Sequence, residues 1–184
     1  MGITATPLDI PDVLLLEPEV FTDARGTFFE AWNRADFVEA TGWEGGLVQD
    51  NQSRSEAGVL RGLHFQLPRA QGKLVRVVAG SAFTVAVDIR RSSPTFGRAV
   101  SAELSEDNHF QLWLPPGFAH GFLALGAPTE VLYKVTAYFD PSCDRGVRWD
   151  DPSLAIDWPL GGSDPLVSER DRNAPLLRDA EVYP

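Results

Sequence analysis

The chain has little of what a disulfide scaffold or a membrane anchor would need. Its 184 residues include one cysteine, Cys143, which excludes an internal disulfide and fits a reducing compartment. No apolar run approaches the ~20 residues of a spanning helix, and the first residues carry neither the basic region nor the apolar stretch of a secretory signal. These absences predict a cytoplasmic protein that does not enter a membrane.

Positive charge is also scarce. The 16 Lys and Arg residues face 26 Asp and Glu, and the resulting net charge of −10 disfavours general nucleic-acid binding. Lysine occurs only at Lys73 and Lys134, so fourteen of the sixteen basic residues are arginines. Arginine suits bidentate phosphate recognition, so a local arginine cluster can still hold a phosphate on an acidic protein. A GC-rich coding sequence would explain the same preference equally well.

Helical periodicity is rare, whereas short apolar runs are frequent. Turn residues such as Ala79-Gly80 and Pro116-Gly117 separate these runs, and the spacing of roughly 8–15 residues is typical of a β-sandwich or barrel. The predicted strands are residues 13–21, 27–32, 46–52, 59–66, 73–78, 83–89, 98–104, 110–114, 121–125 and 131–139.

Capping residues predict two short helices. Asn33 is placed to cap a helix over 34–40 that Gly42 ends, and Ser168 is placed to cap a second helix near 168–173. No repeat, low-complexity tract or linker divides the chain, which predicts a single domain over residues 1–184. From about residue 150 the chain is rich in Asp and Pro, and we expect an irregular tail that wraps the barrel.

Histidine is scarce as well, and its placement is the most informative feature. The chain has only His64, His109 and His120, and His64 lies in the strand-like run Val-Leu-Arg-Gly-Leu-His-Phe-Gln. Metal-binding β-barrels often carry a His-x-His pair on such a strand, but Gln66 takes the second position here. A lone imidazole facing a cavity is a poor metal site and a good proton acceptor. A core histidine satisfied by hydrogen bonds fits the same pattern.

Two segments resemble the motifs of the cupin family of jelly-roll barrels. The run from Gly58 through His64 to Gly80 resembles the first motif with its second histidine and its Glu lost, and residues 115–120, Pro-Pro-Gly-Phe-Ala-His, resemble the second. The resemblance implies an all-β, cupin-type jelly-roll barrel of antiparallel strands with a few short helices. His64 and His120 alone fall short of a catalytic metal site, so no metal is expected and a cupin oxygenase is disfavoured.

Eight segments, in order from about Thr22 to Asp171, are together similar to the dTDP-4-dehydrorhamnose 3,5-epimerase family. Membership implies a dTDP-sugar substrate, no cofactor, and a homodimer in which strands are exchanged between barrels. The segments are Asp23-Ala-Arg-Gly-Thr-Phe-Phe-Glu, Val48-Gln-Asp-Asn-Gln-Ser-Arg-Ser, Leu60-Arg-Gly-Leu-His-Phe-Gln, Val87-Asp-Ile-Arg-Arg-Ser-Ser-Pro-Thr-Phe-Gly, Pro116-Gly-Phe-Ala-His-Gly-Phe, Leu132-Tyr-Lys, Arg148-Trp-Asp-Asp-Pro and Leu166-Val-Ser-Glu-Arg-Asp.

The resemblance implies a role for each matching residue. It makes His64 the catalytic base, Asp171 its carboxylate partner, Tyr133 the catalytic acid and Lys73 the lysine beside the keto group. Phe139 stands where the family usually has a tyrosine that stacks on thymine, and Asp144 where it often has Glu. The implied substrate-binding residues are Arg25, Phe28, Glu30, Gln49, Asn51, Arg61, His120, Phe139, Asp144 and Arg170.

These residue types suit epimerisation beside a ketone. A neutral imidazole can remove the proton, a buried carboxylate can fix its tautomer, a lysine can stabilise the enolate, and a tyrosine on the opposite face can return a proton. The expected reaction converts dTDP-4-keto-6-deoxy-D-glucose at C3 and C5 to dTDP-4-keto-L-rhamnose. Phe139 and Asp144 leave open epimerisation at one carbon only. A non-catalytic cupin that binds a sugar nucleotide is the more distant alternative.

Strand alternation adds two expectations of its own. On a regular strand over 131–139, Tyr133 and Phe139 share one face, while Tyr138 points away unless a bulge intervenes. Alternation also puts Arg61 and His64 on opposite faces of the run 59–66, although the resemblance places both at the ligand. Either a bulge at Gly62 or a contact across a dimer interface would reconcile the two.

Overall fold

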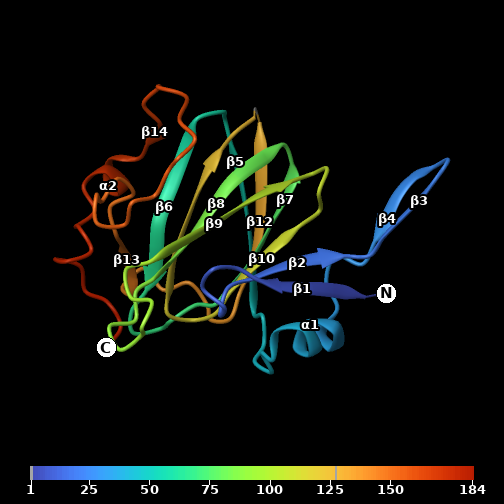
Figure 1. Ribbon diagram of the computed structural model, residues 1–184, viewed down its shortest axis with the longest axis horizontal. Coiled ribbons are helices and arrows are strands. Elements are labelled where there is room, and N and C mark those ends of the chain that lie inside the picture. The colour runs from blue at the N-terminus through green and yellow to red at the C-terminus, as the bar shows by residue number, and fades with distance from the viewer. Residues whose placement is uncertain (1, 127) are drawn as a thin grey trace.

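The computed structural model describes residues 2–126 and 128–184, and its main feature is a pair of antiparallel sheets that face one another (Figure 1). The first sheet has the order β1 (Ile3–Pro7), β2 (Leu14–Pro18), β10 (Gln111–Leu114), β7 (Lys73–Ala79), β12 (Thr129–Val135) and β5 (Gln49–Ser55). The second has the order β13 (Asp144–Gly146), β6 (Val59–Gln66), β11 (Phe118–Ala124), β8 (Ser81–Asp88) and β9 (Ala99–Ser105), and β14 (Leu166–Val167) pairs in parallel with β6. This arrangement confirms the all-β, cupin-type jelly roll.

Apolar side chains are buried on both faces of the sheets. One cluster fills the space between them, with Val75 and Val131 from the first sheet facing Ala86 and Phe122 from the second. The outer face of the second sheet lies under the C-terminal tail, whose Trp158 belongs to the same cluster as β6 and β8 residues. Strands buried on both faces are typically apolar along their whole length, and β11 fits this pattern apart from His120 and Gly121.

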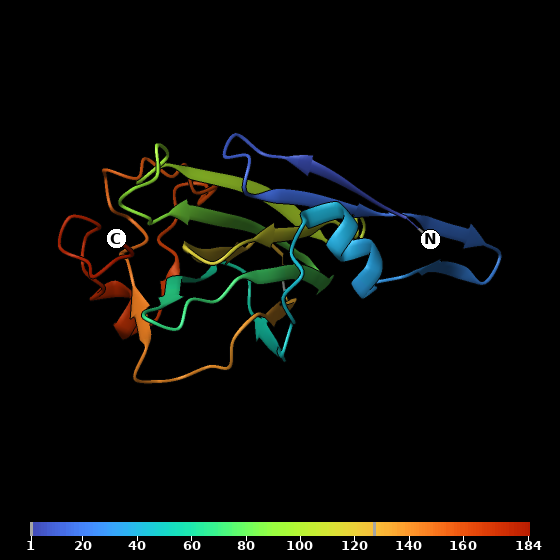
Figure 2. The ribbon, with the colours of Figure 1, turned by 90° about the horizontal axis from the view of Figure 1, so that it is seen from below.

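A hairpin of β3 (Val20–Asp23) and β4 (Gly26–Phe29) extends away from the barrel (Figures 1 and 2). It carries the exposed apolar side chains of Phe21 and Phe28, which are 46% and 63% accessible. Helix α1 (Arg34–Thr41) follows the hairpin, and its Phe37 packs edge-on against Trp113 under the first sheet. Part of the hairpin surface is therefore apolar and uncovered in the single chain.

Several predicted elements need correction. The expected strand 13–21 is wrong as one strand, because the chain leaves the first sheet after Pro18 and β3 pairs with β4 instead. The expected strand 131–139 ends at Val135, and β1, β13 and β14 were not expected. Both helices are confirmed: Asn33 Oδ1 accepts from the Ala35 N–H, and Gly42 ends α1 with a φ of 69°.

The tail is irregular for most of its length, but it also contributes β14 and helix α2 (Glu169–Arg172) to the side of β6. Ser168 caps α2 by accepting a hydrogen bond from the Asp171 N–H. Among the residues that the structure describes, no helix is both long and apolar enough to cross a bilayer.

Candidate active site

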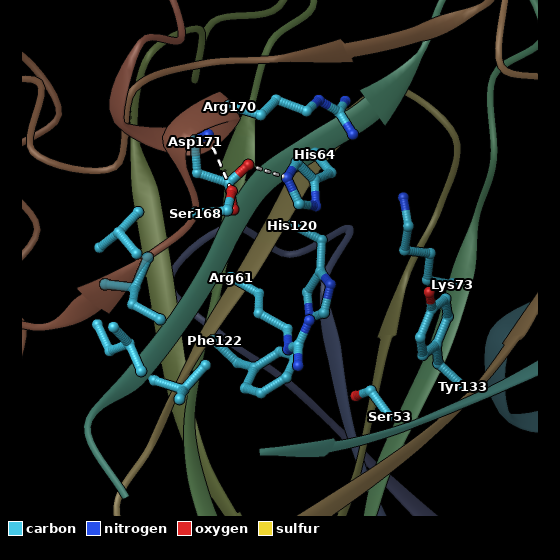
Figure 3. Close-up of a pocket in the computed structure, with 14 residues that line it drawn as sticks. Ser53, Arg61, His64, Lys73, His120, Phe122, Tyr133, Ser168, Arg170 and Asp171 are labelled. Atoms are coloured by element: carbon cyan, nitrogen blue, oxygen red, sulfur yellow. Dashed lines mark hydrogen bonds and ion pairs between the residues drawn. The ribbon is translucent and has the colours of Figure 1, made fainter. Parts of the chain in front are cut away.

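A cavity of about 590 Å³ lies between the two sheets, and an adjoining lobe of about 320 Å³ shares several of its walls. Figure 3 shows His64, His120 and Arg61 on one side of the cavity, with Lys73 and Tyr133 facing them from the other. The tail completes the wall beside His64. The residues common to both lobes are His64, Lys73, Tyr133 and Arg170.

Regular strand pairing explains the wall formed by the first sheet. Tyr133 in β12 pairs with Asn51 in β5, and Val135 pairs with both Gln49 and Lys73. Directly paired residues lie on the same face of a sheet, and residues two apart on one strand do as well. The register therefore puts Tyr133, Lys73, Asn51 and Gln49 on one face.

A bulge in β6 explains the opposite wall. His120 pairs with His64 and Phe122 pairs with Arg61, so β6 has one more residue between its paired positions than β11 has. Gly62 sits in this irregularity with a φ of 120°, where other residues would be strained. The bulge brings Arg61 and His64 to the same cavity within one chain. Of the two explanations for this pair, a bulge at Gly62 or a dimer contact, the bulge is confirmed.

His64 and Asp171 form a close pair. Asp171 Oδ1 lies 2.6 Å from His64 Nε2, and Asp171 Oδ2 accepts from the Gly62 N–H at 3.2 Å. Parallel pairing of β14 with β6, together with the cap at Ser168, brings the carboxylate to this position. When Nε2–H donates to the carboxylate, Nδ1 is the basic nitrogen of the neutral ring.

The carboxylate of this pair is ionised at neutral pH. Burial acts to raise the pKa of Asp171, but hydrogen bonds from His64, Gly62 and Ser168 outweigh it and hold the pKa below its usual value. The carboxyl side chain is only 6% exposed, whereas His64 is 35% exposed to the cavity. The arrangement holds the imidazole in one tautomer and stabilises it when it gains a proton.

Three further groups have pKa values displaced by burial. Burial lowers the pKa of Lys73 to about 8, although the nearby charge of Asp144 acts in the opposite direction. Burial, with help from Lys73 and His64, lowers the pKa of His120 well below its usual value, and burial raises the pKa of Tyr133. His120 is therefore neutral and Tyr133 protonated at pH 7. Within the described part of the chain, the buried Nε2 of His120 has no hydrogen-bond partner.

The second lobe holds most of the remaining predicted residues. Arg170 and Asp144 form an ion pair of 2.7 Å at its edge. Gln49 donates to Asn51 at 2.8 Å and accepts from the Phe139 N–H at 2.9 Å. Phe139 lines this lobe, as alternation predicted, but it does so from a loop, because β12 has already ended. Tyr138, beside it, is 66% exposed and lies outside the lobe.

Three predicted substrate-binding residues lie elsewhere. Arg25 is at the turn of the β3–β4 hairpin, where its side chain is 89% exposed and pairs with Asp23. Phe28 is on the same hairpin, and Glu30 accepts hydrogen bonds from Asn33 at the start of α1. The structure does not bring these three side chains to the cavity of their own chain.

Some cavity residues were not identified as such from the sequence. Ser53 follows Gln49 and Asn51 at intervals of two, so strand alternation was an available signal for it. Ser168 was identified only as a helix cap, although its cap bond is made to Asp171 itself. No metal-ligating group of three or more His, Cys, Asp or Glu side chains occurs among residues 2–126 and 128–184.

Comparisons with known proteins agree with this geometry. Residues 7–179 match the family model described as dTDP-4-dehydrorhamnose 3,5-epimerase. A curated dTDP-4-dehydrorhamnose 3,5-epimerase of Pseudomonas aeruginosa is 54% identical over 180 residues, or 98% of this chain and 99% of the relative. A crystal structure from Legionella pneumophila, a dTDP-6-deoxy-D-glucose-3,5-epimerase in complex with dTDP-4-keto-L-rhamnose, gives a TM-score of 0.93 at 45% identity over 96% of this chain and 94% of that one.

A 3'-monoepimerase from Streptomyces bikiniensis, in complex with dTDP-quinovose, has the same fold with a TM-score of 0.87. It is 33% identical to this chain, and the match covers 97% of this chain and 88% of that one. The family model spans nearly the whole chain, and the curated relative is identical at more than half of the aligned positions. The chain therefore belongs to the dTDP-4-dehydrorhamnose 3,5-epimerase family, a family of isomerases.

Proposed function

We propose that this protein epimerises dTDP-4-keto-6-deoxy-D-glucose at C3 and C5 and releases dTDP-4-keto-L-rhamnose. The observation that carries the proposal is the His64–Asp171 pair, which faces Lys73 and Tyr133 across one cavity. C3 and C5 both flank the C4 ketone, so removal of either proton gives an enolate with its charge on the same oxygen. One set of residues can therefore act at each carbon in turn.

Each half of the reaction is a pair of proton transfers. His64 takes the proton from the carbon, and the electrons of the C–H bond move to the ketone oxygen. The Lys73 ammonium stabilises that enolate oxygen, because a buried positive charge acts strongly in a cavity that excludes water. Tyr133 then protonates the carbon from the opposite face and inverts it. Solvent reprotonates the tyrosinate and deprotonates His64, so no cofactor is consumed.

The remaining cavity residues suit a sugar nucleotide. Arg61 and Arg170 are the two arginines that line the cavity, and they are the cations available for the diphosphate because Lys73 serves the enolate oxygen. Phe139, Gln49 and Asn51 offer a stacking surface and amide groups for the base. Nε2 of His120 has no hydrogen-bond partner among the described residues, and in this proposal it bonds a sugar hydroxyl.

A homodimer would explain the three predicted residues that lie away from the cavity. In this proposal the β3–β4 hairpin of one protomer reaches the cavity of its partner and brings Arg25, Phe28 and Glu30 to it. The exposed Phe21 and Phe28 support the proposal, because an uncovered apolar hairpin is typical of an interaction surface. Mixing refolded His64→Ala and Arg25→Ala protomers tests it. Hybrid dimers should regain activity at one intact site, and no recovery in verified hybrids would reject the shared site.

Epimerisation at a single carbon is the second candidate. The monoepimerase relative has the same fold, and Phe139 and Asp144 differ from the residues usual in the family. The higher identity to the 3,5-epimerase of Pseudomonas aeruginosa favours the double reaction.

Proton exchange read separately at C3 and C5 decides between the candidates. The substrate is incubated with the protein in D2O, and NMR follows deuterium at each carbon. We expect deuterium and inversion at both, with His64→Ala reducing exchange by at least ~10²-fold while dTDP still binds. Exchange at one carbon would establish the monoepimerase. Tight dTDP binding without exchange would indicate a non-catalytic binding protein.

A further inference from the structure

Gln66 connects the strand of His64 with the loop of Phe139. It is the last residue of β6 and is only 2% exposed. Its Nε2 donates to the carbonyls of Arg69 at 3.0 Å and Tyr138 at 3.3 Å, and its Oε1 accepts from the Asp140 N–H at 2.7 Å. The side-chain amide therefore bonds the backbone on both sides of Phe139.

Gln71 makes a hydrogen bond to the same loop at Ala137, one residue before the Tyr138 carbonyl that Gln66 bonds. Its Nε2 donates to the Ala137 carbonyl at 2.8 Å, and the side chain is 7% exposed. Next to it, the Gly72 N–H donates to Thr136 Oγ1 at 2.8 Å, and the Thr136 N–H donates to the Gly72 carbonyl at 3.1 Å. Because β12 ends at Val135, these bonds take the place of a strand ladder over residues 136–140.

Phe139 is thereby held at the wall of the second lobe. Its own N–H donates to Gln49, and the residue is 52% exposed. Gln66 and Gln71 line the same lobe. An aromatic residue on a loop without such hydrogen bonds would sample many positions. Ligand binding would then cost the conformational entropy of fixing one of them. Buried amides that offer donors and an acceptor together are the side chains that can fix two carbonyls and one N–H.

We propose that Gln66 and Gln71 are positioning residues that hold Phe139 as a fixed stacking surface, so that a nucleotide base lies there while the sugar reaches His64. The proposal rests on the proposed function and deepens it by assigning base recognition to two residues that need not touch the ligand. It also gives a reason for Gln66 at a position where metal-binding barrels of this kind carry a histidine. The Gln66 side chain makes hydrogen bonds to the backbone of the loop that carries Phe139.

Gln66→Met tests the role, and Gln111→Met is its matched control. Gln111 is also buried, at 3% exposure, and its Nε2 donates to the Ala31 carbonyl at 2.8 Å on the outer side of the first sheet. Both variants should unfold at lower temperature. Only Gln66→Met should bind dTDP about tenfold more weakly and raise KM, the scale of one or two lost hydrogen bonds, with kcat within a few-fold of the parent.

A double-mutant cycle separates positioning of Phe139 from a general loss of structure. In a Phe139→Ala background, Gln66→Met should cost no further dTDP affinity, because the surface that it positions is gone. Unchanged affinity in Gln66→Met, or a full additional loss beside Phe139→Ala, would overturn the role. Gln71→Met, which removes a single bond, enters the same cycle if Gln66→Met fails to fold. A parent that does not bind dTDP overturns the proposed function, whereas a parent that binds no better than Gln66→Met overturns only the positioning.

Discussion

Replacing Lys73 with methionine should make the protein more stable at neutral pH and abolish its activity. Lys73 begins β7 with 5% exposure, and within the described residues it has neither an ion pair nor a side-chain hydrogen bond. A buried ammonium without a close partner is costly, which is why its pKa falls from 10.5 to about 8. Methionine fills a similar volume and has no charge to desolvate.

The difference between the folded and unfolded pKa of Lys73 sets how much its burial lowers the free energy of unfolding. At about 1.4 kcal/mol per pKa unit, the difference between 10.5 and about 8 corresponds to about 3 kcal/mol of destabilisation. Below about pH 8 the folded and unfolded states both hold the proton, so the whole cost is present. As the pH rises from about 8 to 10.5, only the unfolded state keeps its proton, and the cost is progressively relieved. The parent should therefore gain stability over this window relative to Lys73→Met.

Urea unfolding at pH 7 and pH 10, with both proteins at one protomer concentration, measures the effect. Lys73→Met should be more stable by about 3 kcal/mol at pH 7, and the difference should shrink to below about 1 kcal/mol at pH 10. Titrating groups away from residue 73 are common to both proteins and cancel in the comparison. His120, whose pKa Lys73 helps to lower, is neutral at both pH values because burial is the larger cause of its lowered pKa. A variant that is equally or less stable at pH 7 would refute the reasoning. Lys73→Met should also lose proton exchange. The activity of the parent should decline above about pH 8 as Lys73 loses its proton.

Three other changes probe the proposed chemistry. Tyr133→Phe should still incorporate deuterium into the substrate but fail to invert it, whereas equal loss of both by NMR would give Tyr133 a different role. Arg61→Ala should weaken dTDP binding by the roughly 1.5–3 kcal/mol of a charge-assisted hydrogen bond, and Arg61→Lys should recover only part. If calorimetry finds Arg61→Ala unchanged, the phosphates bind elsewhere. Protein treated with EDTA should keep full activity, and a loss that a divalent ion restores would contradict metal-free catalysis.

Features set by local chemistry could be predicted from the sequence. The bounds 59–66 of β6 match the structure, because an apolar run ends there at a turn. Asn33, Gly42 and Ser168 cap their helices as expected, since capping depends on a few neighbouring residues. The break after Pro18 was missed because the apolar pattern continues across it, while the pairing partner changes from the barrel to the hairpin.

Contacts between distant segments could not be predicted in this way. Asp171 was placed beside His64 through the family resemblance, and no local pattern in a tail rich in Asp and Pro distinguishes it from its neighbours. Its position depends on the parallel pairing of Leu166 with Val59 and on the cap at Ser168. Similarly, strand alternation predicted that Phe139 faces the cavity, and Phe139 does line the second lobe. The strand has ended by then, however, and hydrogen bonds from Gln66 and Gln71 hold the loop that carries Phe139.

Strand alternation placed Arg61 and His64 on opposite faces of β6, whereas the family resemblance placed both at the ligand. The sequence of the neighbouring strand is needed to decide between the two. The sequence of β6 allowed a bulge at Gly62, but a dimer contact explained Arg61 equally well. In the structure, a Cβ on Gly62 would lie 2.6 Å from Gly121 Cα, and one on Gly121 would lie 2.8 Å from the Arg61 carbonyl. The two glycines thus permit a close approach of β6 and β11 that neither strand alone reveals. The same irregularity lets the Gly62 N–H donate to Asp171, so one bulge brings together Arg61, the proposed base His64 and its carboxylate partner Asp171.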